Sequence, residues 1–267
     1  MKIIFFIKNL NSAVGGAERV FCKITSLLAN RGHDISIVTF DKKNTKYFYD
    51  LESSINCFNL SIGDSSSKTK LIEYFKRIFA LRTLFIKEKP NIIVGFMHSS
   101  YIPIAFSLFG LSIPLIASEH TTINYYFKKP LQLSLLLISN LLISRFTVLS
   151  SSIKNRYPFF IARKMTIVSN PILNPEVTDL NKKKSLRKIL LSVGRLEPSK
   201  DHLTLIEAFS VISYQNKDWD LHIIGEGKLR KDIKNKINSL ELNNRIFLKG
   251  FTKKINYEYQ KADIFVM

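Results

Sequence analysis

Ile189-Leu-Leu-Ser-Val-Gly-Arg-Leu-Glu-Pro-Ser-Lys200 is the stretch from which the fold is predicted most directly. Its apolar start, Ile189–Val193, has the length of a strand and leads into a loop, and an apolar helical pattern begins at Leu203. A strand that is apolar throughout is typical of a parallel sheet covered on both faces. Because Arg195 and Lys200 follow the strand, its carboxyl end is expected to seat a diphosphate. The alternative is that both are ordinary surface cations.

The same alternation of short apolar strands and helical stretches continues in both directions along the chain. Strands are expected over residues 2–7, 35–40, 91–97, 114–118, 146–149, 166–168, 221–224, 246–248 and 263–267. Helices are expected between the first two strands, ending near Gly32, and over 68–87, 203–212, 228–240 and 255–261. This alternation predicts an α/β fold with doubly wound parallel sheets.

Helical periodicity also predicts which side chains face the core. In the first helix these are Val20, Ile24, Leu27 and Leu28. In the helix over 68–87 one apolar stripe is expected, formed by Leu71, Phe75, Ile78, Phe79, Leu81 and Phe85. The apolar segment 131–148 contains Arg145 and several small polar residues, so it is expected to be a buried helix running into a strand, with an interfacial helix as the alternative.

A polar segment with two prolines, from Asn170 to Lys184, interrupts the alternation and is interpreted as an interdomain linker. We therefore expect two Rossmann-like domains, over 1–175 and 185–267. No helix follows the last expected strand, 263–267, which would leave an unfinished sheet edge. The second domain is therefore expected to be incomplete.

The chain carries a net charge of +19, which is compatible with a Lys-rich solvated surface, an anionic membrane surface, phosphorylated substrates or nucleic acid. The excess is spread, with +12 over residues 1–178 and +7 over 179–267, and neither zinc-finger spacing nor an RRM-type aromatic motif is present, so no nucleic acid partner is expected. Cys22 and Cys57 lack metal-ligand spacing, which favours a reduced cytoplasmic protein without a metal. The apolar run at the amino terminus is too short for a signal peptide.

Four further motifs lie where strands are expected to end. Gly15-Gly16 opens the first helix and would let an anion approach its free amides, or it is an ordinary turn. His120 ends the stretch from Ile113 and is a ligand contact or a structural histidine. Asn170 faces the same choice between a binding role and turn formation. Gly225-Glu226-Gly227 approaches a nucleotide or forms a tight turn.

Six stretches in order resemble retaining glycosyltransferases of family 4, or group 1, which have two Rossmann-like domains in the GT-B architecture. These stretches are Gly15-Gly-Ala-Glu-Arg19, Ser118-Glu-His-Thr121, Val168-Ser-Asn-Pro-Ile172, Val193-Gly-Arg-Leu196 with Lys200, Ile223-Ile-Gly-Glu-Gly227 and Ala262-Asp-Ile-Phe-Val266. The form of the first two resembles bacterial members that build polysaccharides or lipid-linked glycans.

The resemblance implies roles for named residues. Arg195 and Lys200 would bind the diphosphate of the departing nucleotide, and His120 would lie beside the transferred sugar. The remaining binding positions would be Gly15, Gly16, Asn170, Gly225, Glu226, Phe251 and Thr252, the last two beside the base. The donor would be a UDP- or GDP-linked hexose or N-acetylhexosamine, without a metal or other cofactor. The acceptor would be a cell-surface glycan or polyprenyl-linked sugar, at the inner face of the cytoplasmic membrane.

Family members carry two further donor-contacting glutamates and a final helix beyond a strand like Ala262–Met267, and this sequence ends at Met267. The alternative function is therefore a truncated, catalytically inactive remnant that binds nucleotide. A sugar-nucleotide epimerase and a nucleic-acid-binding protein are two further candidate functions. Conversion of the donor without an acceptor would identify the epimerase. Strongly salt-dependent binding of DNA or RNA would identify the nucleic-acid-binding protein.

Overall fold

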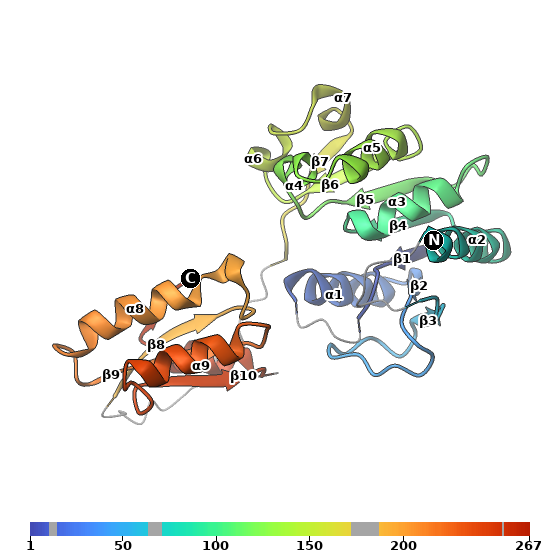
Figure 1. The fold of residues 1–267 in the computed structure, drawn as a ribbon. Coiled ribbons are helices and arrows are strands. Elements are labelled where there is room, and N and C mark those ends of the chain that lie inside the picture. Colours follow the sequence, from blue (N-terminus) through green and yellow to red (C-terminus); the bar gives the residue numbers. More distant parts are fainter. Residues whose placement is uncertain (11–14, 64–70, 172–186, 253) are drawn as a thin grey trace. The chain divides into compact units, whose positions relative to one another are not determined.

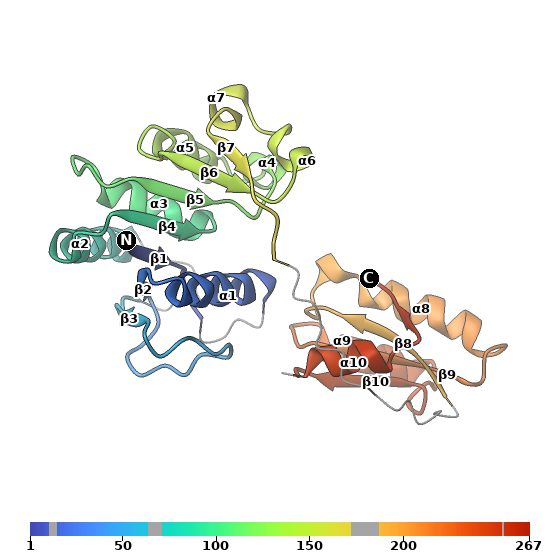
Figure 2. The same ribbon diagram turned by 180° about the vertical axis from the view of Figure 1, so that it is seen from behind.

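The structure is a computed structural model that describes residues 1–10, 15–63, 71–171, 187–252 and 254–267. The chain divides into two compact units, Met1–Ile172 and Leu173–Met267, called here the first and second units. Each unit has its own parallel sheet with helices on its faces (Figures 1 and 2). Most of the predicted linker, from residue 172 onward, lies outside the described residues.

The first unit contains a seven-stranded parallel sheet in the order β3-β2-β1-β4-β5-β6-β7. Its strands are β1 (Lys2–Phe6), β2 (Asp34–Thr39), β3 (Asn56–Asn59), β4 (Ile92–Phe96), β5 (Leu115–Ser118), β6 (Arg145–Val148) and β7 (Met165–Ile167). The strand order reverses between β1 and β4. In open α/β sheets the crevice at the carboxyl ends of two such strands is where ligands bind.

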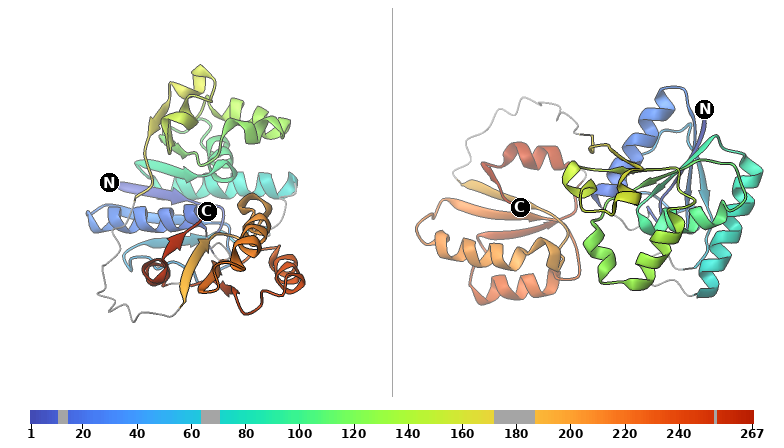
Figure 3. Two further views of the ribbon diagram at one scale, coloured as in Figure 1. Left: turned by 90° about the vertical axis from the view of Figure 1, so that its left-hand side faces the viewer. Right: turned by 90° about the horizontal axis from the view of Figure 1, so that it is seen from above.

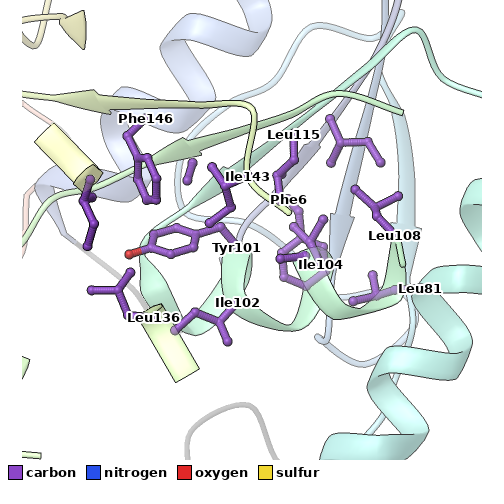
Figure 4. Packing of buried hydrophobic residues seen from close by; sticks show 14 of the residues in the cluster. Phe6, Leu81, Tyr101, Ile102, Ile104, Leu108, Leu115, Leu136, Ile143 and Phe146 are labelled. Atoms are coloured by element: carbon purple, nitrogen blue, oxygen red, sulfur yellow. The ribbon is translucent and has the colours of Figure 1, made fainter. Parts of the chain in front are cut away.

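Helices cover both faces of this sheet. They are α1 (Gly16–Asn30), α2 (Leu71–Glu88), α3 (His98–Ser107), α4 (Ile123–Phe127), α5 (Pro130–Ser139), α6 (Ser151–Lys154) and α7 (Phe159–Ala162). Because side chains alternate along a strand, Ile3 and Phe5 of β1 pack with α1, whereas Ile4 and Phe6 pack into the cluster formed with α2, α3 and α5. Figure 4 shows the latter cluster around Tyr101 of α3.

The second unit contains a four-stranded parallel sheet in the order β10-β9-β8-β11. Its elements are β8 (Lys188–Val193), the 3-10 helix η1 (Pro198–Lys200), α8 (His202–Ser213), β9 (Trp219–Ile224), α9 (Arg230–Ser239), β10 (Ile246–Gly250), α10 (Ile255–Lys261) and β11 (Ile264–Phe265). Helices α8 and α9 cover one face and α10 the other (Figures 1 and 2). The strand order reverses at β8, because β9 pairs with one edge of β8 and β11 with the other.

The structure corrects three of the predicted core faces. Leu27 of α1 is 40% exposed, whereas Phe21 and Thr25 of that helix are fully buried. The single stripe predicted for α2 is wrong, because Phe75 and Phe79 point outward while Leu81 and Phe85 are buried. Helix α5 is a surface helix that buries only Leu136 and Ser139, so the predicted buried helix over this segment is also wrong.

Helices α3, α4, α6 and α7 and strand β3 were not predicted from the sequence. Strand β3 was missed because Asn56-Cys-Phe-Asn59 is short and has asparagine at both ends, whereas the strands that were predicted are nearly continuous apolar runs. Within the described part of the chain, no helix is both long enough and apolar enough to cross a membrane.

Candidate active site

The predicted site residues fall into two groups, one at the carboxyl edge of each sheet. In the second unit, Arg195 and Lys200 lie in the connection from β8 to α8, beside the strand at which the order reverses. The Arg195 side chain is 59% exposed and its guanidinium forms an ion pair with Glu197 at 3.2 Å. The Lys200 side chain is exposed, and its stem lies against Gly194, with Cγ and Cδ 3.4 Å from the place where a Cβ would be. Two accessible cations therefore occupy this strand end.

The neighbouring loop, Gly225-Glu226-Gly227 after β9, packs directly against the β8 loop. Gly225 has φ +146°, and a Cβ there would collide with the carbonyl oxygen of Gly194. A Cβ on Gly227 would likewise collide with the backbone of Leu196. The Leu196 amide donates to the Glu226 carbonyl at 3.0 Å. The two glycines thus allow close packing between the loops. Contact with a nucleotide stays a prediction.

The third loop at this edge follows β10. The Gly225 amide donates to the carbonyl of Gly250 at 2.9 Å, which joins this loop to the β9 loop. Phe251 is 43% exposed, and the Thr252 hydroxyl accepts from the amide of Lys254 at 3.0 Å. Glu226 forms an ion pair with Arg230, the first residue of α9, at 2.5 Å, so its carboxylate is already partnered. The structure therefore brings Arg195, Glu226 and the segment Phe251-Thr252 to one end of one sheet.

In the first unit, His120 follows β5 and is held by side chains on two sides. Its Nε2 shares a hydrogen bond with the Ser118 hydroxyl at 3.0 Å, and Thr147 donates to that hydroxyl at 3.1 Å. Its ring stacks on Phe96 with centroids 5.3 Å apart. Burial lowers the pKa of His120, although nearby Glu119 opposes the shift. The lowered pKa favours the neutral imidazole, which can donate or accept a hydrogen bond without carrying charge.

Glu119 fixes the loop that carries His120. Its side chain is 1% exposed, and Oε1 accepts from the amides of His120 and Thr121 at 2.9 Å and from the Thr121 hydroxyl at 2.7 Å. Oε2 accepts from the hydroxyls of Tyr101 and Tyr126. Five donors on one buried carboxylate satisfy a charge that would otherwise be costly to bury. No separate role for Glu119 was predicted from the sequence, where it is only part of the motif Ser118-Glu-His-Thr121. The reason is that no local sequence pattern shows which carboxylate is buried.

Asn170 and His120 line the same groove in the first unit. The groove has a volume of about 360 Å³ and runs along the face of the sheet beside α1. Phe5, Val94 and Ile116 are among its apolar lining residues. Asn170 itself is exposed at the end of the described segment. The first unit thus combines a neutral histidine and an amide side chain with an apolar surface.

Gly15 and Gly16 begin α1, as predicted. Gly15 is the N-cap residue with φ −120° and has no side chain to cap the helix, and the Glu18 carboxylate lies against it, with Oε2 2.1 Å from where a Cβ of Gly15 would be. Its carbonyl accepts from Arg19 of the first turn and from the Tyr49 hydroxyl, both within 3.3 Å. Around Gly16 no described atom lies within 4 Å of where a Cβ would be. The first amides of α1 have no intrahelical partner, which is the physical basis for predicting an anion there.

A strained turn lies between β4 and α3. It is at the carboxyl end of β4, one of the two strands between which the strand order reverses. Met97 has φ +67°, which is unfavourable for a residue with a side chain. His98 follows and packs on the ring of Tyr125 with centroids 4.9 Å apart, and burial lowers its pKa. In the ranges that the structure describes, no three His, Cys, Asp or Glu side chains are grouped so that they could hold a metal ion.

Comparisons with known proteins account for nearly the whole chain. A sequence model of Glycosyltransferase Family 4 matches residues 14–172, and one of Glycosyl transferases group 1 matches residues 176–267. A curated relative from Campylobacter jejuni is GalNAc-alpha-(1->4)-GalNAc-alpha-(1->3)-diNAcBac-PP-undecaprenol alpha-1,4-N-acetyl-D-galactosaminyltransferase. It is 27% identical over 99% of this chain and 72% of its own length.

A second relative from Campylobacter jejuni is N-acetylgalactosamine-N,N'-diacetylbacillosaminyl-diphospho-undecaprenol 4-alpha-N-acetylgalactosaminyltransferase, 28% identical over 94% of this chain and 69% of its own length. Among solved structures, HepE of Anabaena in complex with UDP and glucose superposes with a TM-score of 0.74 at 18% identity, covering 99% of this chain and 73% of that one. The fold is therefore GT-B, and the relatives identify an enzyme class. The chain belongs to glycosyltransferase family 4.

Proposed function

We propose that this glycosyltransferase moves a hexose or N-acetylhexosamine from a UDP- or GDP-linked donor to a hydroxyl of a glycan or polyprenyl-linked acceptor, with retention of anomeric configuration. The observation that carries the proposal is the position of Arg195 and Lys200 at the carboxyl end of β8, where the strand order reverses. Ligands collect at such points in open α/β sheets.

The two cations have a chemical task that suits this position. When the bond between the sugar and the diphosphate breaks, negative charge builds on the departing diphosphate. The Arg195 guanidinium can form two parallel hydrogen bonds with phosphate oxygens, and the Lys200 ammonium adds a point charge. The Arg195 pair with Glu197 is exposed, so exchanging Glu197 for a phosphate group costs little.

The remaining residues receive positioning roles. Neutral His120 would hydrogen-bond a hydroxyl of the transferred sugar, and its neutrality avoids adding positive charge next to a carbon that is becoming cationic. The free amides at Gly15-Gly16 would approach the diphosphate or the acceptor. Asn170 would contact the donor from the groove that it shares with His120.

In the second unit, the backbone of Gly225 and Glu226 would approach the nucleotide, and Phe251 and Thr252 its base. The exposed ring of Phe251 offers an apolar surface for such a base. The UDP and glucose bound by HepE support a UDP-linked donor for this chain. The acceptors printed in the names of the two Campylobacter relatives support a diphospho-polyprenol-linked sugar. We further propose that the reaction takes place at the cytoplasmic face of a membrane that holds such lipids.

Product formation tests the proposal. The chain is incubated with UDP- and GDP-linked hexoses and N-acetylhexosamines, with and without a polyprenyl-diphosphate-linked glycan, and released nucleoside diphosphate and glycosylated acceptor are quantified. We expect acceptor-dependent release, lowered about 100-fold or more in Arg195→Gln. The anomeric configuration is read by NMR coupling constants, and inversion would contradict retention.

Lys188→Gln is the matched control, because Lys188 begins the same strand at its opposite end and pairs with Asp218 at 3.3 Å. Turnover should be unchanged in this variant. Nucleotide binding without turnover of any donor would instead support the nucleotide-binding remnant. Donor conversion without an acceptor would support an epimerase.

A further inference from the structure

A second groove of the first unit is lined by strand β3 and by the segment that joins β2 to β3. Strand β3 lies at the end of the described sheet and pairs there with β2. Helices cover the two faces of this sheet, α1 on one and α2, α3 and α5 on the other (Figure 3). The groove, called here the β3 groove, has a volume of about 520 Å³, within the range of small-molecule sites. Its lining residues include Lys43, Asn44, Tyr47, Cys57, Phe58 and Asn59.

Several polar groups of the β3 groove remain available for a ligand. Lys43 and Asn44 are exposed, and within the described ranges no carboxylate pairs with Lys43. The Asn59 side chain is oriented by its Oδ1, which accepts from the hydroxyls of Tyr47 at 2.5 Å and Thr39 at 3.0 Å. No described residue accepts from its Nδ2, which can therefore donate to a ligand. An ammonium group and two amide groups thus converge on a groove that no described carboxylate lines.

The segment that forms one wall of the β3 groove also holds the loop between β1 and α1. Asp41 begins this segment, and its Oδ2 accepts from the amide of Leu10 at 2.7 Å. Tyr49, two residues after Tyr47, donates its hydroxyl to the carbonyl of Gly15 at 3.3 Å. A ligand in the groove would therefore contact the segment that positions Gly15 of the candidate active site.

We infer that the β3 groove binds a sugar unit of the acceptor glycan, remote from the hydroxyl that reacts. A sugar ring carries hydroxyl groups around its rim and apolar C–H groups on its faces. These features match a groove that combines amide groups, an ammonium group and aromatic residues. The inference rests on the proposed function for the nature of the acceptor, but binding of a glycan to the groove requires neither donor nor catalysis.

The sheet sets the distance between this groove and His120. The segment after β2 and His120 after β5 lie at the same carboxyl edge. Strands β2, β1 and β4 separate β3 from β5, so the two are four strand spacings apart, or about 19 Å at about 4.8 Å each. Spanning that distance takes a chain of several sugar units. The groove would therefore make binding depend on the length of the acceptor.

Cys57 allows occupancy of the groove to be measured directly. It is an exposed free thiol in the groove, whereas Cys22, the other cysteine of the chain, is buried and has its pKa raised by burial to about 12. Iodoacetamide should therefore alkylate Cys57 selectively. The probes are pentasaccharides of glucose, N-acetylglucosamine and galacturonic acid, which are neutral, amide-bearing and acidic. At about ten times its dissociation constant, at least one of them should slow alkylation about tenfold. An equal rate with all three would overturn the inference.

Asn44→Gly combined with Lys43→Gln removes two groups of the groove without straining the backbone. Asn44 has φ +60°, which glycine adopts freely. Circular dichroism checks that this double variant is folded. The dissociation constant of the protecting glycan should rise about tenfold or more. Lys46→Gln is the matched control, because Lys46 is an exposed lysine of the same segment that does not line the groove. This control should bind the glycan as the natural chain does.

Two further results of the alkylation experiment would overturn the inference. One is full protection of Cys57 by the glycan in the folded double variant. The other is alkylation that slows as the protein concentration rises without any glycan, because a second copy of the chain would then cover β3.

Acceptor length gives a second measurement, made in the complete reaction. The KM of the double variant should rise about tenfold for acceptors long enough to reach the groove. For the shortest acceptor and for the donor, KM should match that of the natural chain. An equal rise for acceptors of every length would overturn the inference, because these residues would then act through the Gly15 loop.

The two proposals fail separately. A chain that turns over donor but shows no protection of Cys57 by a glycan would overturn the groove as a binding site alone. A chain that binds a glycan in the β3 groove but neither binds nor turns over any nucleotide-sugar would overturn the proposed function alone.

Discussion

The two units hold their candidate site residues in different ways. In the first unit, His120 is positioned by side chains, with Glu119 accepting five hydrogen bonds behind it. In the second unit, the loop bearing Arg195 is positioned by backbone packing, since Gly225 and Gly227 bring one loop onto another without side chains between them. The first arrangement should be sensitive to side-chain chemistry and the second to added volume.

The largest expected effect is at Gly225. In Gly225→Ala the new methyl group would overlap the Gly194 carbonyl oxygen at a backbone φ of +146°, so the β8 and β9 loops must separate. We expect a loss of about 3 kcal/mol or more in the free energy of unfolding of the second unit, measured by urea denaturation followed by Trp219 fluorescence. Trp219 lies in β9 of that unit and reports on it directly.

Gly16→Ala is the control for added volume. Residue 16 begins α1, does not have a positive φ and has open space around the new methyl group. Its stability should be unchanged or raised by up to about 1 kcal/mol. Equal destabilisation by both alanines would contradict the role of close loop packing.

A smaller loss is expected at Glu119. In Glu119→Gln the amide nitrogen can no longer accept from hydroxyl or amide donors, so part of the buried network loses its acceptor. We expect about 2–3 kcal/mol of destabilisation in the first unit and a shift of the His120 ring signals in NMR spectra. Thermal unfolding followed by circular dichroism measures the former.

Glu207→Gln is the matched exposed carboxylate, paired with Lys236 at 2.6 Å on the surface. It should cost less than about 1 kcal/mol. If Glu119→Gln were as mild as this control, the network would not be what positions the His120 loop.

The two units should differ least in how their stability depends on pH. Burial lowers the pKa of histidines in both. His98 and His120 of the first unit and His202 and His222 of the second all show this direction. As pH falls below about 6.5, the ordinary pKa of histidine, the unfolded chain takes up protons that the folded chain does not. Stability is therefore lost at acidic pH and is fully present at pH values above that pKa. Urea midpoints should therefore be lower at about pH 5.5 than at about pH 7.5. His120→Gln should flatten that dependence, and an unchanged slope would show that His120 does not contribute.

The fold could be predicted from the sequence to a large extent, because buried parallel strands are mostly apolar and stand out between helical patterns. Strand β8 and helix α10 illustrate this, since their predicted and observed bounds agree within a residue. The side of a helix that faces the core was harder to predict. In α2 the apolar residues form one wide sector of the helix, so periodicity merged Phe79 with Phe85, and only the packing in three dimensions separates them.

The candidate site was predictable where it follows from strand ends. The carboxyl ends of parallel strands share one edge of a sheet, which is why the loops that carry Arg195, Glu226 and Phe251 lie at one edge. What could not be predicted is the support behind these residues. The contacts of Glu119 with Tyr101 and Tyr126 join residues of different elements. The fit of Gly225 against Gly194 depends on loops 31 positions apart in the sequence.

Calorimetric titration of UDP and GDP into the natural chain and three variants tests the central claim most directly. The account predicts saturable binding of at least one of the two nucleotides. Binding should weaken about tenfold or more in Arg195→Gln and in Lys200→Gln, and should be unchanged in Lys188→Gln at the opposite end of the same strand. Equal affinity in all four proteins, or no binding of either nucleotide, would contradict it.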